Sequence, residues 1–418
     1  MPPPHGSAEL PLAERARGRR LAIVSHPAGM THRLVYTDQL PTLTLVALGA
    51  SEAIVGLQSA FEPLGQLLQL PTLRLVGRYH KRTILVVGQT VSVLAGLPLL
   101  AFAALLVLPA PWGVAITLLS LAISTAGITV SDTAWFPMLR AYVEPERTGH
   151  FFGVLRTVWH FTLIAYFIGA QRWLASRPGA FAALFGVATA CGLLRIGLIA
   201  RLPEPPAEHG DRLRIREALD LLRRDRRLRR YLVGVGLCGA ARRALVPFTI
   251  VLMRRILGLS EGDVLLTTLA YFAGGFVSLY LWGRAVDRFG AAPIFGLTGV
   301  GLAALYLALL GVEATPHALY LMIGFFFWLN VMAAGFGVAD THVMFRLAPV
   351  HAPTRHLVVA DVASSLTYGV APLLAGMALD RAVAAGATPL IAYRSLFAIA
   401  ALLTLLSLIP LRHFRAGA

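Results

Sequence analysis

The sequence predicts an all-α membrane protein with twelve transmembrane helices, and three observations lead to that fold class. The 418-residue chain is 57 % hydrophobic and only 14 % charged, with a mean hydropathy of +0.69. In a soluble domain about a quarter of the residues are charged. Apolar stretches of about 20 residues, the length that crosses a bilayer, recur along the whole chain, and short motifs repeat between its two halves.

The expected helices form two groups of six, separated by one long polar segment. We expect a cytoplasmic N-terminal tail over 1–20 without a secretory signal, a first six-helix bundle over 21–201, a basic cytoplasmic linker over 202–230, and a second six-helix bundle with a short tail over 231–418. The individual spans are expected at 21–45, 53–76, 83–108, 113–138, 151–173, 179–201, 231–256, 264–283, 291–311, 316–341, 356–378 and 390–411.

The positive charge indicates membrane topology rather than a nucleic-acid partner. The net charge is +16, with 37 Lys and Arg residues, and in a soluble protein such a balance would suggest nucleic acid. Most of these cations lie in the two tails and in the loops that follow even-numbered spans. Such an excess marks the cytoplasmic side, so both termini are predicted to be cytoplasmic and the partner is the lipid bilayer.

Two motifs repeat at an offset of 208 to 209 residues. Leu48-Gly49-Ala50-Ser51 follows the first span as Leu257-Gly258-Leu259-Ser260 follows the seventh, and Ser131-Asp132-Thr133 closes the fourth span as Ala339-Asp340-Thr341 closes the tenth. Parallel repeats of this kind build several membrane bundles, so the two halves are expected to be pseudo-symmetric.

A loop motif carries a family resemblance. Residues 283–290 read Gly-Arg-Ala-Val-Asp-Arg-Phe-Gly, which matches the signature G-x-x-x-D-R-x-G, and on it the chain resembles the major facilitator superfamily. In the first half Gly77 and His80 replace the Asp and Gly of the corresponding loop. The resemblance implies a secondary transporter that works by alternating access, without a cofactor and without enzymatic activity.

Two catalytic-looking motifs have a simpler explanation. Gly234-x-Gly236-x-x-Gly239 lies inside an apolar span and lacks the βαβ unit that a dinucleotide site needs. Gly258-x-Ser260-x-Gly262 is expected in a turn between helices rather than at a strand-turn-helix elbow. No metal motif is present, and the cysteines, Cys191 and Cys238, lie in apolar spans, so neither a metal nor a cofactor is expected.

Ionisable residues inside the membrane are functional hypotheses by default. The repeat places Arg33 and Arg242 at the same depth on the first and seventh helices, which line the central cavity in the family fold. Guanidinium groups bind carboxylate or phosphate bidentately, so we expect Arg33 and Arg242 to bind an anionic solute, with His26 and Thr37 on the same helical face as Arg33. A structural pairing of each arginine with an internal carboxylate is the alternative.

Acidic residues supply candidates for coupling and gating. Glu62 lies near mid-depth in the second span, and we expect it either to couple transport to protons or to pair permanently with Arg33. A cytoplasmic gate is predicted from Asp132, Arg156, Asp340 and Asp361, together with Asp287, Arg288 and Arg346. A local pair of Asp132 with Arg156 is the alternative to that gate, and Arg195 is expected to snorkel toward the interface.

Together these features predict a secondary transporter for a small, anionic organic solute, either coupled to protons or working by exchange. Two alternatives stay open, namely an exporter of drugs or amphiphiles and a transporter-like receptor that moves no solute. The protein is expected to act as a monomer in the inner membrane of a bacterium.

Overall fold

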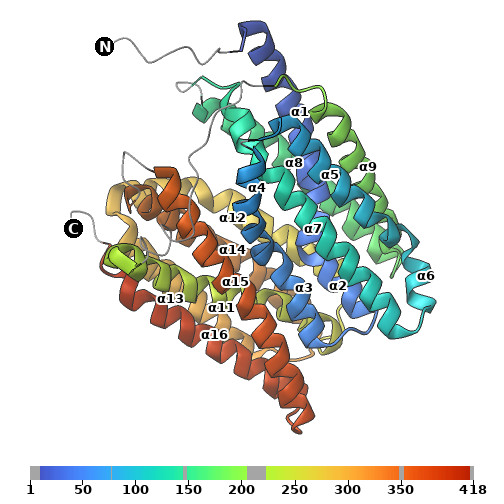
Figure 1. Cartoon of the computed structure of the whole chain (residues 1–418). Helices are drawn as coiled ribbons and strands as arrows, with labels where there is room; N and C mark the ends of the chain where they lie inside the picture. Colours follow the sequence, from blue (N-terminus) through green and yellow to red (C-terminus); the bar gives the residue numbers. More distant parts are fainter. Residues whose placement is uncertain (1–9, 77, 145–147, 205–222, 348–352, 415–418) are drawn as a thin grey trace. The chain divides into compact units, whose positions relative to one another are not determined.

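The computed structural model describes residues 10–76, 78–144, 148–204, 223–347 and 353–414. Every regular element in these ranges is helical (Figure 1), as the composition predicted. The helices of the first half are α1 (Leu12–Thr37), α2 (Gln39–Ala47), α3 (Glu52–Gly65), α4 (Gln69–Val76), α5 (Lys81–Gly96), α6 (Phe102–Val107), α7 (Ala110–Arg140), α8 (Thr148–Ser176) and α9 (Phe181–Ile199).

The helices of the second half are longer and less interrupted. They are α11 (Arg226–Arg255), α12 (Glu261–Phe289), α13 (Ala291–Ala308), α14 (Ala318–Leu347), α15 (Pro353–Ala384) and α16 (Pro389–Leu411). Among the described residues, ten helical segments are long and apolar enough to cross a bilayer. The first two predicted spans fall outside that group, since α1, although 26 residues long, is too polar, and the second span divides into α3, a short 3-10 turn and α4.

Two boundaries differ from the sequence prediction because of local contacts. Helix α1 begins at Leu12, inside the segment predicted as a tail, where Gly18 packs against the Tyr142 ring and Arg19 donates to the Tyr142 carbonyl at 3.1 Å. Helix α11 begins at Arg226, inside the predicted linker. The Asp225 side chain caps it by accepting from two backbone N–H groups at 2.9 Å, which satisfies donors that a helix start leaves unpaired.

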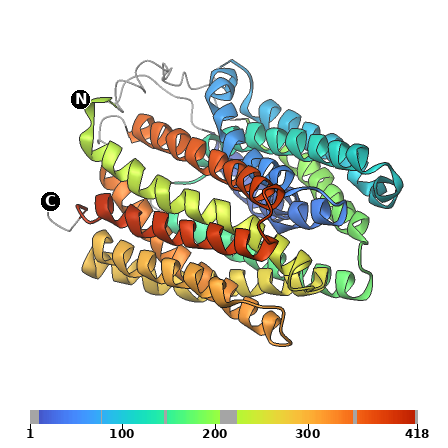
Figure 2. The same ribbon diagram turned by 90° about the horizontal axis from the view of Figure 1, so that it is seen from below.

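The chain packs as two compact units. Unit 1 comprises 1–44, 65–169 and 179–212, and unit 2 comprises 45–64, 170–178 and 213–418. In unit 1, α5 packs on α7 and α1 packs on α9. In unit 2, α11 lies beside α15 and α16 (Figure 2), and α12 packs on α14. The segment 45–64 therefore packs with the second half of the chain, and the domain boundaries drawn from the sequence remain a prediction.

The repeated motifs adopt the same local structure. Gly49 and Gly258 have φ angles of 75° and 67°, which glycine adopts readily and other residues rarely do. Gly290, the last residue of the loop signature, has φ 79° and ends α12 directly before α13 starts. The loop signature thus ends in a tight turn between α12 and α13, with its last glycine in the left-handed region. Helix packing also explains the glycines of the seventh span, since a Cβ atom at Gly234 or Gly239 would collide with Leu411 or Tyr368.

Candidate functional site

In unit 1, a single carboxylate lies between two guanidinium groups. Arg33 in α1 donates to Oδ2 of Asp132 in α7 at 2.5 Å, and Nη2 of Arg195 in α9 lies 3.6 Å from Oδ1 of the same carboxylate. The side chains of Arg33 and Asp132 are 26 % and 22 % exposed, whereas that of Arg195 is 4 % exposed. Two positive charges thus share one negative charge, which leaves these three side chains with a net charge of +1.

The burial of Arg195 corrects two predictions. Its side chain does not snorkel, because it crosses α1 at Gly29, where a Cβ atom would collide with the guanidinium group. The alternative pair of Asp132 with Arg156 is not formed among the described residues. Asp132 binds Arg33 and Arg195 instead, and the Arg156 side chain is exposed. Asp132 therefore belongs with the predicted substrate-binding residue Arg33.

Aromatic rings surround this ion pair. The Trp135 ring lies parallel to the His26 ring, with centroids 5.7 Å apart and an interplanar angle of 2°, and the Arg195 guanidinium lies 5.2 Å from the Trp135 centroid. Trp159 approaches His26 edge-on at 6.5 Å. Thr37, by contrast, donates its hydroxyl hydrogen to the Arg33 carbonyl at 3.0 Å, within α1. The structure thus brings His26, Arg33 and Asp132 into one region of unit 1.

Arg242 in unit 2 has a different environment from Arg33. Its electrostatic neighbours include the hydroxyl groups of Tyr271, Tyr306 and Tyr368. Tyr368 packs on Gly239, which lies one turn before Arg242 in α11, and the Tyr306 hydroxyl is buried without a hydrogen-bond partner among the described residues. Arg242 itself forms no ion pair or hydrogen bond within the described part of the chain. Its guanidinium donors are therefore available to a ligand.

A carboxylate lies near Arg242 but is bound elsewhere. Asp340 in α14 accepts a hydrogen bond of 2.5 Å from the hydroxyl of Tyr231, and it is within electrostatic range of Arg242. We refer to Arg242, Asp340 and the four tyrosines 231, 271, 306 and 368 as the Arg242 cluster. The sequence analysis grouped Asp340 with the gate and missed the tyrosines, because single tyrosines in apolar helices carry no distinctive pattern.

Glu62 has an ion partner that the sequence analysis did not identify. Its Oε2 accepts from Nη1 of Arg243 at 3.0 Å, with the Glu62 side chain 21 % exposed. Both residues belong to unit 2, although they come from opposite halves of the sequence. Arg243, the neighbour of Arg242 in α11, is thus a described partner of Glu62, and the pairing of Glu62 with Arg33 remains a prediction.

The remaining residues predicted for the gate have exposed side chains. Asp287 and Arg288 lie in the last turn of α12, where the Arg288 guanidinium lies 5.2 Å from the Phe289 ring centroid. Asp361 and Arg346 are exposed on α15 and α14. Asp287 and Arg346 do not pair with each other among the described residues. Gly77 of the first-half loop lies outside them, and the gate remains a prediction.

A polar network joins four helix ends within unit 2. The Asp380 carboxylate in α15 accepts from the backbone N–H groups of Glu52 and Ala53 at 3.1 and 3.0 Å, which caps the start of α3. The Glu52 carboxylate in turn accepts from Arg255 of α11 at 2.7 Å and from Tyr393 of α16 at 3.0 Å. Gly56 and Gly376 allow α3 and α15 to touch, since a Cβ atom at either would meet the other backbone.

We expect Asp380→Ala to lower the stability of the folded chain by about 1–2 kcal/mol, because it removes the cap from two N–H groups of α3. Thermal unfolding of the purified protein in detergent would measure the loss. Arg381→Ala is the matched control, since this neighbouring side chain is exposed and its removal should change stability by less than about 0.5 kcal/mol. Equal effects of the two substitutions would contradict the cap.

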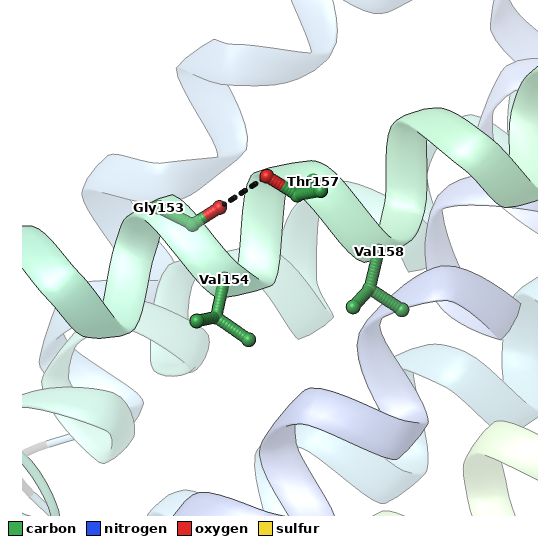
Figure 3. Close-up of a pocket in the computed structure, with 4 residues that line it drawn as sticks. All are labelled: Gly153, Val154, Thr157 and Val158. Carbon is green, nitrogen blue, oxygen red and sulfur yellow. Dashed lines mark hydrogen bonds between the residues drawn. The ribbon is translucent and has the colours of Figure 1, made fainter.

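A pocket of about 380 Å³ lies along α8 in unit 1 (Figure 3). Its lining is Gly153, Val154, Thr157 and Val158, so it is mostly apolar. The Thr157 hydroxyl donates to the Gly153 carbonyl at 2.9 Å, as the dashed line in Figure 3 shows. The one polar side chain of this described lining is already bonded to the helix, and none of the four described lining residues is charged.

Comparison with known proteins identifies the fold. No family model and no curated protein matches the sequence. Among solved structures, the chain is similar to a mutant of the nucleoside transporter NupG, with 12 % identity, a TM-score of 0.72 and coverage of 96 % of this chain and 99 % of that one. A bacterial homologue of the iron transporter ferroportin, in an inward-facing state, gives 15 % identity, a TM-score of 0.71 and coverage of 96 % and 98 %.

A third structure agrees with these two. The bacterial homologue of the human lysosomal transporter Spinster matches with 14 % identity, a TM-score of 0.68 and coverage of 97 % of this chain and 99 % of that one. All three are described as transporters or as homologues of transporters. The twelve predicted spans, the repeated turns and this similarity over nearly the whole chain lead to one conclusion: the chain is an integral membrane protein with the twelve-helix fold of the major facilitator superfamily.

Proposed function

We propose that the protein is a secondary transporter that moves a small organic solute with an anionic group by alternating access. The fold supports transport, since the similar structures are transporters of nucleosides, iron and other solutes. Their substrates differ, so the fold alone supports no particular solute. The choice of an anion rests on the charged residues of the chain itself.

The observation that carries the proposal is the state of Arg242. This arginine lies in a membrane helix, has no ion pair within the described residues and has tyrosine hydroxyl groups as neighbours. Asp340, a carboxylate within its electrostatic range, is hydrogen-bonded to Tyr231 instead. A guanidinium group in a membrane helix without a directly paired counter-ion is unfavourable. An anionic ligand would supply the counter-ion, and the planar fork of arginine suits a carboxylate or phosphate group. Tyrosine hydroxyl groups could donate further hydrogen bonds to it.

Arg33 contributes to the same preference in a different way. Its charge is partly neutralised by Asp132, so it acts through the excess positive charge that it shares with Arg195. A positive potential in a site of low dielectric attracts anions. Joint binding of one solute by Arg33 and Arg242, with His26 and Thr37 as neighbours, remains part of the proposal.

Coupling to protons is proposed at Glu62. Its ion pair with Arg243 is adjacent in sequence to the proposed solute-binding arginine, so a change at either site can reach the other along α11. Protonation of Glu62 would release Arg243 and alter the charge beside Arg242. Exchange of one anion for another is the second form of coupling that this arrangement allows.

Uptake by proteoliposomes tests the function. We expect saturable uptake of at least one labelled carboxylate or organophosphate from a panel, above the level of empty liposomes. Lipophilic cations are the comparison arm. Transport of lipophilic cations without any anion would favour the exporter. Binding of an anion, seen as raised thermal stability, without any uptake would favour the receptor.

A further inference from the structure

Three buried polar groups without hydrogen-bond partners lie in one cluster of unit 1. They are Nδ1 of His26, Nε1 of Trp135 and Nε of Arg195, none of which has a partner among the described residues. The cluster is contiguous, because Trp135 stacks on His26 at 5.7 Å and lies 5.2 Å from the Arg195 guanidinium. Native proteins rarely leave buried donors unpaired, so several in contact indicate a missing acceptor.

The chemistry of these groups specifies what the acceptor is. The indole nitrogen of Trp135 and Nε of Arg195 can only donate, and the imidazole nitrogen of His26 donates in one of its tautomers. Arg33 and Arg195 both pair with the carboxylate of Asp132 in the same region. These hydrogen-bond donors lack acceptors and lie beside the positive charge of Arg33 and Arg195. A site of this composition binds an anion more favourably than it binds a water molecule or a cation.

We propose that this cluster, which we call the Trp135 site, binds a small monovalent inorganic anion such as chloride. Trp135 and Arg195 are each only 3 % exposed, so the site is too enclosed for an organic solute. One negative charge would balance the net charge of +1 on Arg33, Asp132 and Arg195. It would also accept hydrogen bonds from the indole N–H of Trp135 and from the Nε–H of Arg195, two donors that have no partner among the described residues.

The Trp135 site and the Arg242 cluster have no residue in common, although His26 is also a neighbour in the joint solute site proposed for Arg33 and Arg242. Arg242 belongs to unit 2, and every residue of the Trp135 site belongs to unit 1. The inference therefore stands whether or not the chain transports an organic anion. It gives Trp135, which the proposed transport function leaves without a role, a resident ion as its ligand.

Halide titration of the purified full-length protein tests the proposal. The chain is held in sodium gluconate at constant ionic strength while chloride or bromide replaces gluconate, and the apparent melting temperature is recorded. We expect a saturable rise with either halide, since a ligand that binds only the folded state raises apparent stability.

Trp135→Phe keeps the ring but removes the N–H donor. It should weaken the apparent halide affinity about 10- to 150-fold, the factor that loss of a hydrogen bond to a charged group gives.

Arg284→Gln is the matched control. This exposed arginine lies 5.5 Å from the Tyr280 ring centroid in unit 2, far along the chain from the site. It should leave the halide titration unchanged despite the loss of one charge.

Anomalous scattering from crystals of the unaltered protein soaked in bromide provides a second measurement, in which we expect a peak beside Arg195 and Trp135. A melting temperature that halide does not raise, an unchanged titration in Trp135→Phe, or bromide peaks only elsewhere would each overturn the proposal.

Discussion

Replacement of Arg242 by lysine is expected to weaken binding of the anionic solute by about 10- to 150-fold, which corresponds to the loss of about 1.5–3 kcal/mol from a hydrogen bond to a charged group. Lysine keeps the positive charge but lacks the planar fork that binds a carboxylate or phosphate bidentately. The effect should appear both in the dissociation constant, measured by thermal shift or calorimetry, and in uptake by proteoliposomes. Folding should be retained, because Arg242 has no ion pair among the described residues that lysine would break.

The control for this substitution is Arg284→Lys, at an exposed cation on α12. It should leave binding and uptake unchanged. If Arg242→Lys binds and transports the anion as the wild type does, the guanidinium group of Arg242 does not recognise the solute. The exporter would then become the better interpretation of the fold.

Asp132→Asn is expected to reduce the stability of the folded chain by about 3 kcal/mol, the lower end of the range for breaking a buried ion pair. The substitution preserves the shape of the side chain but leaves the charges of Arg33 and Arg195 without their carboxylate. The lower end applies because Arg33 and Asp132 are 26 % and 22 % exposed and so partly solvated. Equilibrium unfolding in mixed micelles, or the apparent melting temperature, would measure the loss.

The double substitution Arg33→Gln with Asp132→Asn is the matched test of this interaction. It removes one cation together with the anion, so Arg195 is left with the same net charge of +1 that the wild-type cluster carries. We expect the double variant to recover a substantial part of the stability that Asp132→Asn loses. A strictly additive loss in the double variant would mean that Arg33 and Asp132 do not interact energetically.

The fold was predictable from the sequence because hydrophobic length is a local property. A run of about 20 apolar residues must cross the membrane whatever its partners are, and the described helices of the second half begin and end within several residues of the predicted spans. Turns were predictable for the same reason. Gly49, Gly258 and Gly290, which belong to the repeated motif and the loop signature, adopt positive φ angles, a backbone conformation that glycine reaches readily.

The candidate site was predictable in part. Counting residues along a helix of 1.5 Å rise gives the depth of a charged side chain, and that depth singled out Arg33, Arg242, Glu62 and Asp132. Periodicity does not say which neighbouring helix a side chain meets. The sequence therefore could not distinguish Arg195 as a buried partner of Asp132 from a snorkelling residue, and it gave no sign of the ion pair between Glu62 and Arg243.

Only the tertiary structure decided these pairings, because each joins residues far apart in the chain. Asp132 meets Arg33 across 99 residues, Glu62 meets Arg243 across 181, and Asp380 caps Glu52 across 328. Such contacts depend on helix rotation and on small residues such as Gly29, Gly56 and Gly376, which let backbones and long side chains approach closely. The sequence determined which segments cross the membrane and how deep their charges lie, whereas packing determined which of those charges are neutralised and which are left for a ligand.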